Sequence, residues 1–130
     1  MITCWLIDDN EIDLLITRKL LQTWDPSLAI EEFSDARIAL DRLNKSEVAP
    51  QLIFLDLFMP EFSGWDFLDK YQNIPTTDNT LLYVLSSSID DADIEKARTY
   101  RMVTGYISKP VTKESYERAM AAYRKLLIED

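Results

Sequence analysis

Three carboxylates, one hydroxyl and one ammonium group stand where short apolar runs of the sequence end. The residues that carry them are Asp8, Asp9, Asp56, Ser86 and Lys109. Carboxylates that approach within about 4 Å repel each other by roughly 4 kcal/mol at an effective dielectric constant of about 20. A divalent cation removes that repulsion, and Mg²⁺ accepts ligation by oxygen atoms alone. If the fold brings these residues together, they predict a magnesium site.

A metal ion, an ammonium group and a hydroxyl around one carboxylate could together handle a phosphoryl group. The metal and the Lys109 ammonium would neutralise the phosphoryl oxygens, and the Ser86 hydroxyl would donate a hydrogen bond to them. A carboxylate is also a competent nucleophile toward phosphorus, and its attack gives an aspartyl-phosphate. The residue types therefore indicate phosphoryl chemistry.

The elements that must position these residues are strands and helices in strict alternation. The apolar runs that we predict as strands cover residues 2–7, 28–33, 51–55, 81–85 and 103–107. Helical patterns cover about residues 11–24, 34–43 and 64–71, and two more begin after the capping residues Asp90 and Thr112. Five such units in series predict an α/β fold with a parallel sheet.

A parallel sheet explains how distant residues could form one site. The carboxyl ends of all its strands lie on the same edge, which is where sites form in open α/β sheets. Residues roughly 50 positions apart, such as Asp8, Asp56 and Lys109, would then meet at that edge.

Composition excludes several classes of function. The 130 residues suit one domain spanning 1–130, and 14 Lys+Arg against 23 Asp+Glu give a net charge of −9. That charge argues against nucleic acid and against an anionic membrane surface. The chain has no histidine and only Cys4, so it offers no histidine base or ligand, no internal disulfide and no thiolate zinc site. No signal peptide or apolar span of about 20 residues is visible, and we expect a cytoplasmic protein.

Four motifs carry a family resemblance. The segments LIDDN, LIFLDLFMPEFSGWDFL, LLYVLSSSID and YISKP occur in this order. Together they resemble the receiver domain of two-component response regulators, over about residues 2–127, and the chain looks like a single-domain, chemotaxis-type regulator. The resemblance implies a flavodoxin-like, doubly wound (βα)5 fold whose parallel five-stranded sheet has the order 2-1-3-4-5.

The resemblance also implies the roles of the acidic residues. Asp56 would be the phospho-acceptor and a ligand of Mg²⁺. Asp9 would coordinate Mg²⁺ directly, and Asp8 would do so directly or through water. The backbone carbonyl of Phe58 would complete the protein ligands.

Further roles follow from the same resemblance. Lys109 would contact the phosphoryl group, and its peptide bond to Pro110 would be cis. Ser86 stands at the position of a switch hydroxyl that is drawn to the phosphate. Tyr106 stands at the aromatic switch position, although an ordinary half-buried strand aromatic is an equal alternative. The output surface would lie on the fourth helix, the fifth strand and the fifth helix.

The expected function is therefore a phospho-accepting signalling switch, not an enzyme with turnover on a separate substrate. Because the chain has no histidine, the phosphoryl donor would be another protein, a sensor histidine kinase or a histidine phosphotransfer protein. A downstream protein target would read the output surface. We expect a monomer or a weak dimer.

Three alternative functions make different demands on these residues. A receiver-like scaffold would bind its partners without phosphorylation. A Mg²⁺-dependent phosphohydrolase of the haloacid-dehalogenase type needs a second aspartate two residues after its nucleophile, and Phe58 stands there. A flavin-binding domain would need a loop that cradles phosphate after the first strand, and Asp8 and Asp9 would repel phosphate there.

Overall fold

Five strands alternate with five helices in the computed structural model, which describes residues 2–45, 49–75 and 79–129. The strands are β1 (Thr3–Ile7), β2 (Ala29–Phe33), β3 (Leu52–Leu55), β4 (Leu81–Ser86) and β5 (Val103–Ser108). The helices are α1 (Glu11–Trp24), α2 (Ala36–Asn44), α3 (Gly64–Tyr71), α4 (Asp91–Arg98) and α5 (Lys113–Glu129). All strand pairs are parallel, and the order β2-β1-β3-β4-β5 confirms the predicted doubly wound topology.

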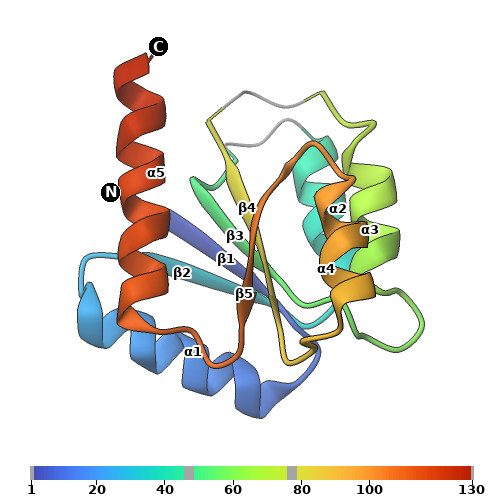
Figure 1. The fold of residues 1–130 in the computed structure, drawn as a ribbon, viewed down its shortest axis with the longest axis horizontal. Coiled ribbons are helices and arrows are strands. Elements are labelled where there is room, and N and C mark those ends of the chain that lie inside the picture. Colours follow the sequence, from blue (N-terminus) through green and yellow to red (C-terminus); the bar gives the residue numbers. More distant parts are fainter. Residues whose placement is uncertain (1, 46–48, 76–78, 130) are drawn as a thin grey trace.

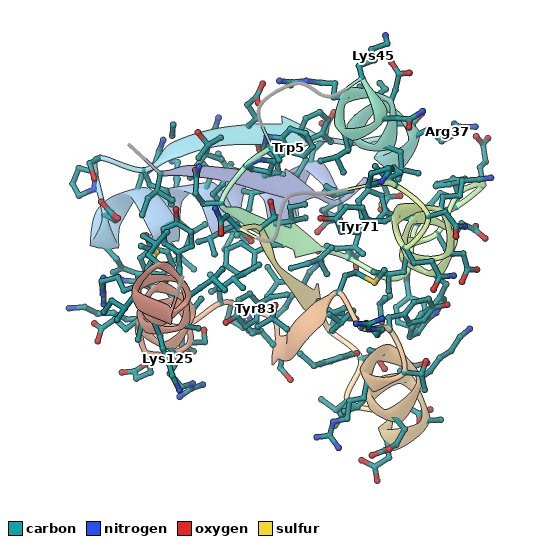
Figure 2. All side chains as sticks on the ribbon, turned by 90° about the horizontal axis from the view of Figure 1, so that it is seen from above. Trp5, Arg37, Lys45, Tyr71, Tyr83 and Lys125 are labelled. Atoms are coloured by element: carbon teal, nitrogen blue, oxygen red, sulfur yellow. The ribbon has the colours of Figure 1, made fainter. Side chains whose placement is uncertain are left out.

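Helices cover both faces of the sheet. Figure 1 shows α1 and α5 on one side of the sheet, and α2, α3 and α4 on the other. Successive side chains of a strand point to opposite faces, so β1 sends Cys4 and Leu6 toward α1 and α5, and Trp5 and Ile7 toward α2 and α3. In Figure 2, Trp5 lies on the α2 side of the sheet and Tyr83 on the α5 side.

The central strand β3 is buried on both faces. Each of its four residues is at most 1% exposed, which explains why its sequence is continuously apolar and does not alternate. Each face carries its own hydrophobic core, so the sheet is held between two packed layers. Burial in one of these cores raises the pKa of the Cys4 thiol, which therefore stays protonated and unreactive.

Capping residues determine where the helices begin. The Asn10 side chain accepts hydrogen bonds from the backbone N–H groups of Ile12 and Asp13, and α1 starts directly after it. Helix α2 starts at Ala36, later than the predicted residue 34. Its cap is Asp35, whose side chain accepts a hydrogen bond from the backbone N–H of Arg37. Across the described ranges, no helix combines the length and the hydropathy that a membrane span requires.

Candidate functional site

Backbone hydrogen bonds bring the ends of β1, β3 and β5 to one edge of the sheet. Ile7 pairs with Leu55 in the parallel register, and the N–H of Asp56 donates to the carbonyl of Ile7 at 2.9 Å. The N–H of Lys109 donates to the carbonyl of Ser86 at the same distance. The hydrogen bonds of the sheet therefore fix the backbone positions of Asp56 and Lys109.

Three carboxylates meet at this edge. One oxygen from each of Asp8, Asp9 and Asp56 lies within 4.8 Å of the other two. Asp8 is 6% exposed and Asp56 is 8% exposed, whereas Asp9 is half-buried. Oxygen ligands gathered at this separation fit a hard divalent cation such as Mg²⁺. The three predicted acidic ligands thus lie together in a geometry that suits the metal.

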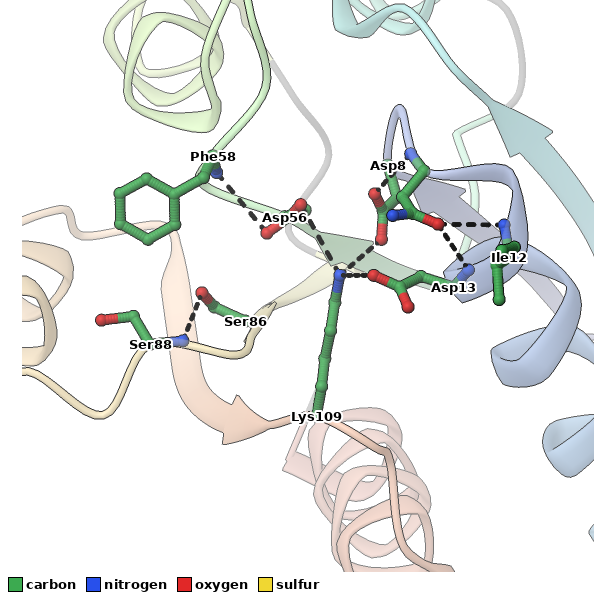
Figure 3. Close-up of polar contacts among 9 residues, drawn as sticks. Asp8, Ile12, Asp13, Asp56, Phe58, Ser86, Ser88 and Lys109 are labelled. Carbon is green, nitrogen blue, oxygen red and sulfur yellow. Dashed lines mark hydrogen bonds and ion pairs between the residues drawn. The ribbon is translucent and has the colours of Figure 1, made fainter.

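Lys109 extends from the end of β5 into this acidic group, as Figure 3 shows. Its Nζ atom donates to Asp8 Oδ2 at 2.6 Å and to Asp13 Oδ2 at 2.9 Å. It lies 3.6 Å from Asp56 Oδ2, which is an ion-pair distance. Sequence reasoning identified Lys109 and missed Asp13, which enters the site from the first turn of α1.

The electrostatics of the site follow from its burial. The pKa of Asp56 is raised to about 6, mainly by desolvation and then by the negative charge of Asp8. The positive charge of Lys109 lowers this pKa but does not cancel the rise. Burial would lower the pKa of Lys109, but hydrogen bonds to Asp8 and Asp13 and the charge of Asp56 outweigh it and raise that pKa. The lysine is therefore a permanent cation, while an ionised Asp56 is costly without added positive charge.

The loop after β3 packs closely under Asp56. A Cβ atom at Gly64 would lie 2.3 Å from the Asp56 carbonyl oxygen and 2.7 Å from the Leu57 Cα atom. Only glycine lets the start of α3 approach the loop this closely. The N–H of Phe58 points to Asp56 Oδ1 at 3.5 Å, and the Phe58 side chain is 52% exposed, so it does not pack in the core.

The two predicted switch residues are joined through one loop residue, Ser88. The buried Ser86 hydroxyl accepts from the N–H of Ser88 at 3.2 Å, and the Tyr106 hydroxyl donates to the Ser88 carbonyl at 3.0 Å. The Ser88 hydroxyl in turn donates to Asp93 in α4 at 2.8 Å. Among the described residues, no hydrogen bond links the Ser86 hydroxyl to Asp56. Ser88 thus connects the strand ends to α4.

The isomer of the peptide bond that follows Lys109 is also the one predicted in the sequence analysis. The bond between Lys109 and Pro110 is cis, the predicted isomer.

Comparisons with known proteins agree with this architecture. Residues 4–121 match the model of the response regulator receiver domain. The chain is similar to the two-component response regulator ORR41 of Oryza sativa subsp. japonica, with 24% identity over 95% of this chain and 95% of that protein. It is also 24% identical to transcription factor SKN7 of Chaetomium thermophilum, over 96% of this chain and only 16% of that protein.

A solved structure supports the same relationship. The crystal structure of a two component response regulator from Cytophaga hutchinsonii superimposes with a TM-score of 0.86 and 25% sequence identity, covering 95% of this chain and 96% of that chain. Because the family model matches most of the sequence and the Cytophaga hutchinsonii structure shares its fold, the chain belongs to the response regulator receiver domain family.

Proposed function

We propose that Asp56 accepts a phosphoryl group from the phospho-histidine of a sensor kinase or a phosphotransfer protein. Receiver domains act in general as phosphoryl-accepting switches, bind Mg²⁺ at an acidic pocket and interact with such proteins. The observation that carries the assignment for this chain is the position of Asp56. Its buried carboxylate lies in the acidic group and 3.6 Å from the ammonium, whereas both carboxylate oxygens of Asp8 already accept hydrogen bonds.

The chain's own residues support an in-line transfer. An Asp56 oxygen attacks phosphorus while the bond from phosphorus to the donor histidine breaks, and the histidine keeps the bonding electron pair. The Lys109 ammonium, 3.6 Å from Asp56 before transfer, pairs with the phosphoryl oxygens and stabilises their charge. Asp8, Asp9, Asp56 and the Phe58 carbonyl would hold Mg²⁺, which supplies positive charge to the carboxylates and the phosphoryl oxygens when it is bound.

Ser86 and Tyr106 would pass the signal to the output surface. A Ser86 hydroxyl that turns toward the phosphoryl group stops accepting from the N–H of Ser88. The Ser88 carbonyl also holds the Tyr106 hydroxyl, so a shift of this loop would release the aromatic ring and the start of α4. This change would bias a two-state equilibrium of the face formed by α4, β5 and α5, where a downstream protein would bind.

Helix α1 offers a surface for the phosphoryl donor. Ile12 is 68% exposed, Leu15 is 41% exposed and Ile16 is 44% exposed. Ile16 also lines a pocket with Asp13 and Lys109, so the apolar surface reaches the edge of the site. A protein that presents phospho-histidine to Asp56 would cover these side chains and gain their burial.

Other features of the proposal rest on composition. The net charge of −9 favours protein partners over nucleic acid or anionic lipid. We propose a cytoplasmic protein that is a monomer or a weak dimer and has no turnover on a separate substrate.

Intact-mass measurement tests the proposal directly. The protein is incubated with acetyl phosphate and Mg²⁺, and again with a chelator. We expect one added phosphoryl group per chain, lost with the chelator and absent in Asp56→Asn. Asp91→Asn, an exposed change in the first turn of α4, is the matched control and should label normally. Stoichiometric labelling of Asp56→Asn would refute the assignment.

The alternatives predict different results. A phosphorylation-independent scaffold would bind its partner equally well before and after the Asp56→Asn change. A phosphohydrolase would release many phosphate ions per chain from a phosphate ester.

A further inference from the structure

The contact between Lys109 and Asp13 is not explained by the chemistry proposed above. We propose that Asp13 is a positioning residue that holds the Lys109 ammonium on the α1 side of the site and competes with the phosphoryl group for it. This inference rests on the proposed function, since it concerns how tightly the same site binds a phosphoryl group.

The distances place the ammonium closer to Asp13 than to the acceptor. The Nζ atom of Lys109 is 2.9 Å from Asp13 Oδ2 and 3.6 Å from Asp56 Oδ2. An ammonium group has three N–H donors, and Asp8 and Asp13 take two of them. Figure 3 shows Asp13 and Asp56 on opposite sides of the lysine tip. One donor is left for a phosphoryl group on Asp56, which would share the ammonium with Asp13 or draw it away.

Asp13 differs from the other carboxylates that face Lys109. The group of oxygens close enough to ligate one cation comprises Asp8, Asp9 and Asp56, without Asp13. Asp13 therefore adds a negative charge to the site without being one of the ligands of the cation. Its side chain is 37% exposed whereas that of Lys109 is 13% exposed, so it reaches the buried lysine from the solvent side.

The position of Asp13 in α1 keeps it available for this contact. It stands in the first turn, where the helix dipole favours a negative charge. Its backbone N–H is already satisfied by the Asn10 cap. The side chain is not needed to start the helix, so the carboxylate is free to bind the lysine.

Removal of the Asp13 charge should therefore tighten phosphoryl binding. Asp13→Asn keeps the size of the side chain and an oxygen acceptor but loses the charge. Partly exposed ion pairs and charge-assisted hydrogen bonds are modest in strength, so we expect an affinity increase of about three- to tenfold.

Beryllofluoride, an analogue of the phosphoryl group, measures this affinity without a reaction. Its binding is followed by ¹⁹F NMR at Mg²⁺ concentrations that saturate each protein, so that differences in Mg²⁺ affinity do not enter. The matched control is Glu11→Gln, which removes one charge from the same exposed turn of α1. In the described structure no hydrogen bond or ion pair joins Glu11 to Lys109. We expect Asp13→Asn to bind the analogue more tightly, and Glu11→Gln and Asp13→Glu to stay within about twofold of the wild type.

The outcomes separate this inference from the proposed function. An affinity of Asp13→Asn that equals or falls below that of the wild type overturns the inference, because the competition would be absent. An equal gain in Glu11→Gln also overturns it, because the effect would then be one of net charge alone. If the wild type shows no bound ¹⁹F signal, the proposed function fails, and this inference fails with it.

Discussion

Ionisation of Asp56 should lower the free energy of unfolding when no divalent cation is present. Desolvation, followed by the charge of Asp8, raises the pKa of Asp56 from 3.8 to about 6. A group whose pKa is raised by folding contributes stability that is fully present below its unfolded pKa and is lost as the pH rises through its folded pKa. Asp56 should therefore cost the folded state about 3 kcal/mol above pH 6 in metal-free buffer.

The Asp56→Asn variant isolates this cost, because it removes the ionisable group and keeps the size of the side chain. With pKa values of 3.8 unfolded and about 6 folded, the contribution of Asp56 changes by roughly 1 to 2 kcal/mol between about pH 5 and about pH 8. The stability of Asp56→Asn relative to the wild type should therefore rise by this amount between the two pH values. Urea denaturation followed by tryptophan fluorescence in chelator-treated buffer measures both free energies of unfolding.

Two controls sharpen this experiment. Asp91→Asn changes an exposed carboxylate in α4, and its difference from the wild type should vary by no more than a few tenths of a kcal/mol with pH. Addition of Mg²⁺ at about 100 times its dissociation constant should stabilise the wild type by about 2.7 kcal/mol, and Asp56→Asn by less. A stability difference between Asp56→Asn and the wild type that is independent of pH would refute the electrostatic reasoning.

Three further changes, the first with a control, test separate parts of the site. Gly64→Ala places a Cβ atom 2.3 Å from a backbone oxygen and should lower the free energy of unfolding by more than about 2 kcal/mol in urea denaturation. Gly105→Ala, which meets only a tyrosine side chain at 3.1 Å, should cost less. Lys109→Met removes the cation 3.6 Å from Asp56 and should tighten Mg²⁺ binding about tenfold in calorimetry, while labelling by acetyl phosphate slows. Ile12→Ser should slow transfer from a phospho-histidine protein in a radiolabel assay, with labelling by acetyl phosphate unchanged.

Much of the fold could be predicted because each strand has a clear sequence pattern. The run at β3 is apolar at every position, since both faces of that strand are buried, and the polar residues that follow each strand mark its end. The start of α2 was harder to predict, because Ser34 and Asp35 are both good capping residues. Which of the two caps the helix depends on the backbone conformation directly after β2, and the local sequence does not determine that conformation.

The contact between Asp13 and Lys109 shows what the sequence could not reveal. In the sequence, Asp13 is an acidic residue in the first turn of a helix, where the helix dipole alone accounts for it. The two residues lie 96 positions apart, and their contact depends on the rotation of α1 and on the conformation of a long lysine side chain. Knowledge of the sheet topology is sufficient to bring Lys109 to the site, but not to say which carboxylates it binds.

This difference reflects two kinds of positional control in the site. Asp56 and Lys109 start from backbone atoms that are held by ladder hydrogen bonds of 2.9 Å to neighbouring strands, so any sequence with this topology places them at the same edge. Asp13 and Ser88 come from a helix and a loop, where side-chain hydrogen bonds decide the contact. If strand ends supply the reacting groups and the helix and loop residues adjust them, changes at Asp56 should abolish phosphorylation, whereas changes at Asp13 should alter only its affinity. Loss of labelling in Asp13→Asn would contradict this division, because it would place a helix residue among the reacting groups.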